Sequence, residues 1–93
     1  MRITQAEKKT ICDAIHGFDP EARIFLFGSR ADDAKRGGDI DIIVLSKTLS
    51  PAHKLKIKAS IFGTLDEQKI DIVISNNQTD AFVKLILRDA IPL

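Results

Sequence analysis

The sequence has few of the features that direct a protein out of the cell or into a membrane. It contains one cysteine, Cys12, so no intrachain disulfide can form. No apolar run approaches the roughly 20 residues that a membrane-spanning helix needs, and nothing near the N-terminus has the pattern of a secretory signal. We therefore expect a cytoplasmic protein.

Neither sign of charge is in excess, which removes one common reason for binding nucleic acid. Lys and Arg total 14 and Asp and Glu total 13, so no long-range field would attract DNA, RNA or an anionic membrane. We expect no direct nucleic-acid binding and no membrane partner. The composition, 44% hydrophobic and 29% charged, is that of a folded globular chain, and 93 residues suffice for one hydrophobic core. The prediction is a single domain over residues 1–93.

Helices and strands alternate along this domain. Thr4 and Glu7 have the spacing of a capping box, which predicts a helix over residues 5–16 that ends at Gly17. Short runs rich in β-branched and aromatic residues predict three strands, over residues 23–27, 39–45 and 69–74. Strands mixed with helices over so short a chain predict an α/β (α+β) fold, a small mixed sheet of three to four strands covered by helices.

Two further helices are expected. Ser50 and Pro51 form a helix-start pattern, after which apolar residues recur at helical spacing. These residues are Leu55, Ala59, Phe62 and Leu65. The last helix, over residues 79–88, is apolar over more than one core-facing stripe. Either it is wedged into one core, or it also covers a second surface that contacts a protein partner or another copy of the chain.

Acidic residues interrupt two of the predicted strands. Because strand side chains alternate between faces, Asp39 and Asp41 share one face, whereas Ile40 points to the other. Asp71 repeats this arrangement in a strand that we expect about 5 Å away. Crowded carboxylates repel one another, and a hard cation such as magnesium would neutralise them.

Three carboxylates can hold two ions about 3.5–4 Å apart, so that one activates an attacking oxygen and the other stabilises the leaving oxygen. This pattern predicts Asp39, Asp41 and Asp71 as catalytic residues and as metal ligands. The alternative is a purely structural role, because aspartates at strand ends often cap turns. This role would explain Asp39, but it would not explain Asp41 together with Asp71.

A glycine and its neighbours precede the acids and suit a phosphate group. Gly28 permits a sharp turn and a close approach to a ligand, and the Ser29 hydroxyl with nearby backbone N–H groups can hold phosphate oxygens. Arg30 is the basic residue best placed to neutralise a triphosphate, although a solvated side chain is the ordinary role of an arginine on a polar loop. We therefore predict that Gly28, Ser29 and Arg30 bind the nucleotide.

Gly28-Ser29, the Asp-x-Asp of residues 39–41 and the later strand acid Asp71 together resemble the minimal nucleotidyltransferase (MNT) branch of the DNA polymerase beta-like superfamily. The resemblance spans nearly the whole chain. It implies that the acids bind two magnesium ions, that Gly-Ser binds the triphosphate, and that AMP is transferred from ATP. Many stand-alone members act as antitoxins that adenylylate a tyrosine of a HEPN toxin, so the resemblance also implies a HEPN-type partner.

Two other functions stay open at this point. The chain could be a binding module that neutralises a partner by contact, against which the intact acidic trio argues. It could also modify a small molecule, as aminoglycoside nucleotidyltransferases do. We rank this role low because larger relatives use a second domain to recognise the acceptor, and this chain ends directly after its last predicted helix.

Overall fold

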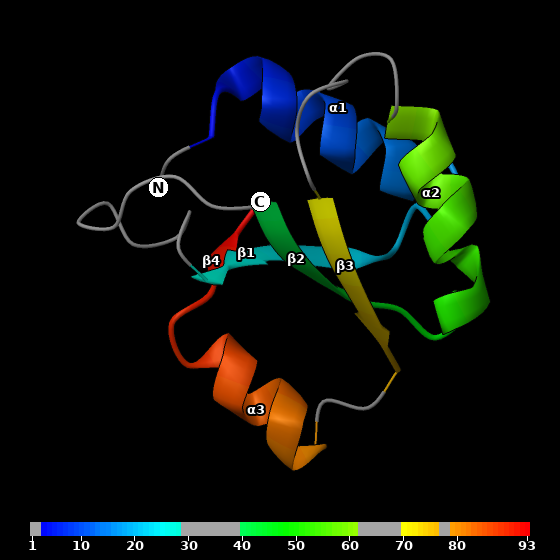
Figure 1. The fold of residues 1–93 in the computed structure, drawn as a ribbon. Coiled ribbons are helices and arrows are strands. Elements are labelled where there is room, and N and C mark those ends of the chain that lie inside the picture. Colours follow the sequence, from blue (N-terminus) through cyan, green and yellow to red (C-terminus); the bar gives the residue numbers. More distant parts are fainter. Residues whose placement is uncertain (1–2, 29–39, 62–69, 77–78) are drawn as a thin grey trace.

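The computed structural model describes residues 3–28, 40–61, 70–76 and 79–93. Ser29, Arg30 and Asp39 fall outside these residues. The described chain forms one sheet with helices on both of its faces (Figure 1). In chain order the elements are α1 (Gln5–His16), β1 (Arg23–Phe27), β2 (Ile40–Leu45), the 3-10 turn η2 (Pro51–His53), α2 (Lys54–Ile61), β3 (Ile70–Ser75), α3 (Ala81–Leu87) and β4 (Ile91–Pro92).

The sheet is mixed, as predicted, and has four strands in the order β3-β2-β1-β4. β1 and β2 are antiparallel, whereas β2 and β3 are parallel and are connected through α2. No strand was predicted after the last helix, yet β4 pairs with β1, and the Leu93 N–H extends this pairing by donating to the Ile24 carbonyl at 2.9 Å. A two-residue strand containing proline shows no periodicity, so only its pairing identifies it.

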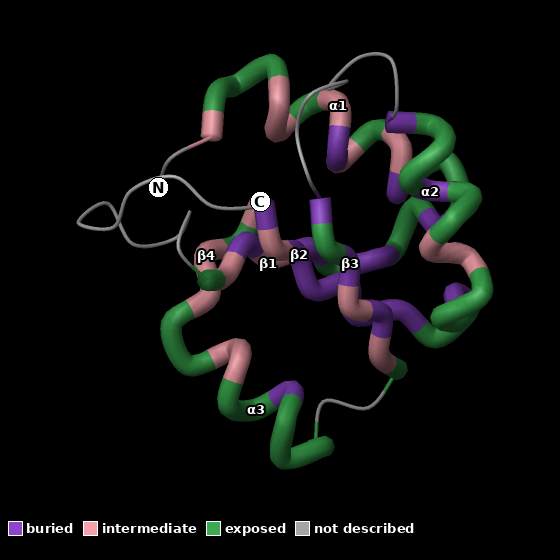
Figure 2. The backbone as a smooth tube through the Cα atoms, in the orientation of Figure 1, coloured by how far each residue is buried: buried purple, intermediate pink, exposed green. Residues whose placement is uncertain are grey.

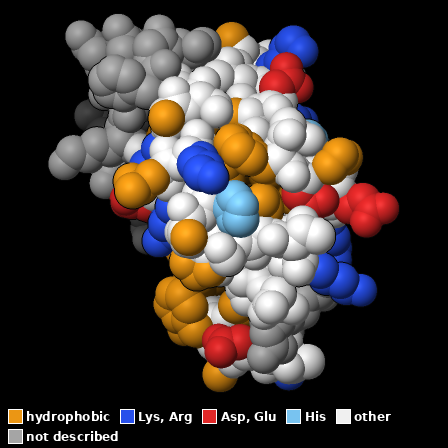
Figure 3. Space-filling view, turned by 90° about the vertical axis from the view of Figure 1, so that its right-hand side faces the viewer, with side chains coloured by type: hydrophobic (Ala, Val, Ile, Leu, Met, Phe, Trp, Pro, Cys, Tyr) orange, Lys and Arg blue, Asp and Glu red, His pale blue; other side chains and the backbone are white. Residues whose placement is uncertain are grey.

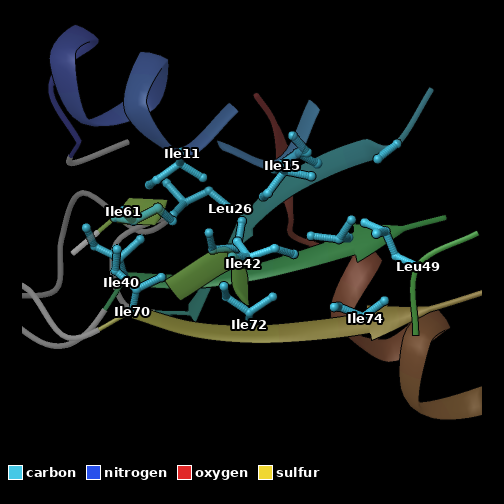
Figure 4. Close-up of a cluster of buried hydrophobic side chains, with 14 residues drawn as sticks. Ile11, Ile15, Leu26, Ile40, Ile42, Leu49, Ile61, Ile70, Ile72 and Ile74 are labelled. Atoms are coloured by element: carbon cyan, nitrogen blue, oxygen red, sulfur yellow. The ribbon is translucent and has the colours of Figure 1, made fainter. Parts of the chain in front are cut away.

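The main core lies between the sheet and the helices α1 and α2. Ile11 and Ile15 of α1 are fully buried, and they pack with strand side chains such as Ile42 and Ile72 (Figures 2 and 4). α1 begins as the capping box predicts, because the Glu7 N–H donates to the Thr4 hydroxyl at 3.0 Å. The even-numbered residues of β2 and β3 therefore face this core, in agreement with the predicted alternation.

The second helix does not face the core with the apolar residues that predicted it. Leu55 is 78% exposed and Ala59 is also exposed, whereas Ile57 and Ile61 are buried. Both pairs have the same four-residue spacing, but they differ by two positions, which rotates one pair about 200° around the helix from the other. The apolar pattern alone did not decide between them. Leu55 is one of four large hydrophobic side chains that are exposed among the described residues; exposed hydrophobic side chains are visible on the face drawn in Figure 3. Phe62 and Leu65 lie outside the described residues.

The other face of the sheet is covered by α3. Val83 packs on Ile43 and Leu45 in a second, smaller core cluster, while Phe82 and Leu85 remain 58% and 62% exposed. A helix wedged into one core would bury all of these side chains, so that interpretation is wrong. α3 instead covers a second face of the sheet and presents two large apolar side chains outward.

A buried polar pair joins the segment before β1 to the end of β2. The Ser46 hydroxyl donates to the Asp19 carboxylate at 2.5 Å, and the Glu21 N–H donates to the same carboxylate at 3.0 Å. These donors stabilise the charged form, so they lower the pKa of Asp19. Among the described residues, no helix is long and apolar enough to span a membrane.

Candidate active site

The structure places two of the three predicted acids side by side. In the parallel pairing of β2 and β3, Asp41 is the partner of Asp71, and in the antiparallel pairing of β1 and β2 it is the partner of Phe27. In-register residues of neighbouring strands point to the same face, and the strands lie about 4.8 Å apart. Phe27, Asp41 and Asp71 thus form one row across three strands, which we call the acid row.

The acid row lies on the face of the sheet that α3 covers in part. Ile43 and Val73, two residues further along β2 and β3, belong to the α3 cluster, and side chains two residues apart share a face. Asp41 is half-buried and Asp71 is exposed. The row stands at the amino ends of β2 and β3, where the intervening Ile residues fill the opposite core and hold the two carboxylates on their own face.

Gly28 follows β1 and lies against the carboxylate of Asp41. Its φ is 75°, a conformation that glycine adopts readily and other residues do not. A Cβ atom at this position would lie 3.3 Å from Asp41 Cγ and in collision with Asp41 Oδ2. The group that Gly28 approaches in the structure is the Asp41 carboxylate, and its predicted approach to a ligand stays a prediction.

Neither this contact nor the place of Phe27 in the acid row was predicted from the sequence. Both follow from the register of β1 against β2, in which Phe27 pairs with Asp41 and Gly28 comes next. The sequence pattern that would have indicated the contact is a glycine directly after one strand, next to a second strand that bears an acid.

The donor set fits a hard divalent cation. Two neighbouring carboxylates offer only oxygen atoms, which magnesium and manganese prefer, and Asp71 forms no ion pair with a described residue. The described residues contain no group of three His, Cys, Asp or Glu side chains that could hold a metal. Asp39, the third predicted ligand, lies outside the described residues, so its role stays a prediction.

Comparison with known families gives an independent result. The sequence matches the family described as Polymerase beta, Nucleotidyltransferase over residues 9–93. The chain belongs to this nucleotidyltransferase family. The match includes all four strands, and hence the whole acid row and Gly28. Comparison with curated proteins gave no match.

Membership gives the acid row of this nucleotidyltransferase a chemical meaning. Transfer of a nucleotidyl group requires stabilisation of negative charge at the reacting phosphate, and paired carboxylates that hold a divalent cation are one way to provide it. The matched span also contains Ser29, Arg30 and Asp39, whose positions the structure does not describe. The individual roles of the site residues stay predictions from the sequence.

Proposed function

We propose that this nucleotidyltransferase transfers AMP from ATP to a hydroxyl group, with two magnesium ions held by Asp39, Asp41 and Asp71. The observation that supports this most directly is the pairing of Asp41 with Asp71 on adjacent parallel strands. A surface cap needs no second acid beside it, whereas a divalent cation does. Magnesium, when bound, would neutralise the phosphate oxygens and lower the pKa of an attacking hydroxyl.

The protein's own groups would then position the reactants. Gly28, which has no side chain, leaves room for the Asp41 carboxylate at the end of β1, and together with Ser29 and Arg30 it would bind the triphosphate. Asp71 is exposed, so it can face an arriving acceptor. The acceptor oxygen forms a bond to the α-phosphorus, the bond from that phosphorus to the bridging oxygen breaks, and pyrophosphate leaves. The acceptor proton passes to a carboxylate or to water.

We further propose that the chain belongs to the minimal nucleotidyltransferase branch and acts in the cytoplasm as the antitoxin of a HEPN-type toxin, whose tyrosine is the acceptor. The exposed Phe82 and Leu85 of α3 support a protein partner, because large apolar side chains side by side at a surface are characteristic of contact sites. A hydroxyl on such a partner would be brought to the acid row by docking.

The test is incubation of the chain with α-labelled ATP and magnesium, with and without any protein encoded beside it. Label should move to the partner with the wild-type chain and with Asp89→Asn, an equivalent change at an exposed acid outside the acid row, but not with Asp41→Asn. Labelling by Asp41→Asn at the wild-type rate would refute the proposal. Mass spectrometry of the labelled partner would then show whether tyrosine is the acceptor.

The alternative is an antitoxin that works by contact alone, and the exposed apolar side chains of α3 favour it equally. Phe82→Ser with Leu85→Ser should abolish neutralisation under either hypothesis, but only the catalytic one requires Asp41. Toxin neutralised fully by Asp41→Asn in tight complex, without transfer of label, would establish masking. Transfer of label to an aminoglycoside and not to the protein would instead establish the small-molecule activity.

A further inference from the structure

A polar hollow lies on the same face of the sheet as the acid row, at the other end of the strands. Here Arg23 pairs with Leu45, and Leu45 pairs with Ser75, so these three residues form a row across β1, β2 and β3. The hollow has a volume of about 200 Å³. Its wall consists of Asp19, Glu21, Arg23, Leu45, Ser46, Lys47, Thr48, Ser75 and Asn76.

The hollow is separate from the acid row. Leu45 lies four positions after Asp41 along β2, a distance of about 13 Å in a strand. The row between them contains Ile43, and Val83 of α3 packs on it. A group bound in the hollow would therefore not touch the carboxylates of the acid row.

Hydrogen bonds hold the floor of the hollow in place. The Ser46 hydroxyl donates to Asp19 and accepts from the N–H groups of Thr48, at 3.2 Å, and Leu49, at 2.9 Å. The Ser46 N–H donates to the Ser75 carbonyl at 3.0 Å, which continues the pairing of β2 with β3. The hollow is thus preformed, and a ligand would not have to order it.

The polar groups that remain for a ligand are mostly donors. Arg23 and Lys47 are exposed and form no ion pair with a described residue, whereas the Asp19 carboxylate already accepts two hydrogen bonds. The Arg23 guanidinium lies 5.3 Å from the centre of the Phe25 ring, and a stacked guanidinium keeps its N–H groups available for an oxyanion. The Asn76 amide adds further donors.

We propose that this hollow is a binding site for an oxyanion, a phosphate or carboxylate group of a small molecule, held by Arg23, Lys47 and Asn76. The hollow has two cationic side chains, Arg23 and Lys47, and besides Asp19 one carboxylate, that of Glu21. This balance of charge favours an anion over a metal ion. A volume of about 200 Å³ accommodates such a group together with a few further atoms. The site is independent of the proposed transfer reaction.

The test is titration of the isotopically labelled chain with inorganic phosphate, followed by two-dimensional NMR, at ionic strength kept constant with sodium chloride. Saturable shifts are expected at the amides of Lys47, Thr48 and Asn76. Acetate in place of phosphate shows whether carboxylates are accepted as well. Shifts confined to Gly28 and Asp41 would mean that phosphate binds near the acid row only, and the proposal would be wrong.

Charge-neutral variants provide the control. Arg23→Gln with Lys47→Gln should weaken phosphate binding at least about tenfold, whereas Lys56→Gln with Lys58→Gln, the same loss of charge on exposed residues of α2, should leave it unchanged. Lys47→Gln alone, which leaves the Arg23–Phe25 contact intact, should weaken binding by a smaller factor. Equal weakening by both double variants, or shifts produced equally by chloride, would overturn the proposal.

Discussion

Gly28→Ala is expected to disturb the Asp41 carboxylate without changing any charge in the molecule. The added methyl group would collide with Asp41 Oδ2, and the backbone φ of 75° would strain any residue other than glycine. Asp41 lies on β2, which pairs with a strand on each side, so its backbone cannot easily move away. The carboxylate itself must therefore rotate out of its position.

The two effects can be given separate magnitudes. An alanine held in the left-handed region costs about 1–2 kcal/mol. Steric coupling between neighbouring side chains commonly adds about 1 kcal/mol. The sum lies below the stability of about 5–15 kcal/mol that is usual for a domain, so the variant should fold. A catalytic group displaced by about 1 Å can reduce the rate about hundredfold, so activity should fall far more than stability.

The assay is urea denaturation together with transfer of label from ATP, and Gly17→Ala is the matched control. Gly17 has a φ of −66°, and an added Cβ there would meet only two backbone carbonyls at 3.4 Å. Its replacement should change the free energy of unfolding by less than about 1 kcal/mol and leave the activity intact.

A double-mutant cycle isolates the collision from the backbone strain. In a chain that already carries Asp41→Ala, the carboxylate is gone, so Gly28→Ala should cost only the strain, about 1 kcal/mol less than in the wild-type background. Equal costs in the two backgrounds, with wild-type activity in Gly28→Ala, would refute the reasoning. The measurement of stability needs no substrate and therefore stands apart from the proposed reaction.

Three further predictions concern the core, the stability at low pH and the metal. Ile57→Ala should lower the free energy of unfolding by about 2–5 kcal/mol because the side chain is fully buried. Leu55→Ala, on the exposed side of the same helix, should change it by less than about 0.5 kcal/mol. Equal losses of the two variants in urea denaturation would contradict the orientation of α2. Because folding lowers the pKa of Asp19 below its usual 3.8, the stability it adds is present above that value and disappears as the pH falls through the folded pKa. Asp19→Asn should therefore reduce the loss of unfolding free energy as the pH is lowered, measured by urea denaturation at a series of pH values. An unchanged loss would mean that other groups cause it. Magnesium should raise the melting temperature of the wild-type chain, and it should raise that of Asp41→Asn and of Asp71→Asn less, as calorimetry in magnesium-free and magnesium-containing buffers would show.

Much of the local structure could be predicted because neighbouring residues determine it. The first helix begins at the Thr4–Glu7 capping box and has the predicted bounds, and the first strand also has its predicted ends. Alternation placed Ile40 and Asp41 on opposite faces of one strand, which the buried position of Ile40 confirms. These features depend on contacts within a few residues, which a sequence pattern records directly.

The remainder depends on contacts between distant segments. Which side of α2 faces the core was decided by the position of the sheet and of α1, and no property of Leu55 or Ile57 alone distinguishes them. The strand β4 exists because β1 offers it an edge. The contact between Gly28 and Asp41 required the register of β1 and β2, which the spacing of the motifs did not provide.

The two paired acids differ in how firmly the sheet holds them. Asp41 belongs to β2, which has a hydrogen-bonded neighbour on both sides, whereas Asp71 belongs to β3, the terminal strand of the described sheet. The position of Asp41 is thus fixed from both sides, whereas Asp71 is fixed by β2 and by the core residues of its own strand, so a shift of β3 would change the gap between the two carboxylates. If the acid row binds a cation as proposed, the width of this gap would set its affinity for that cation.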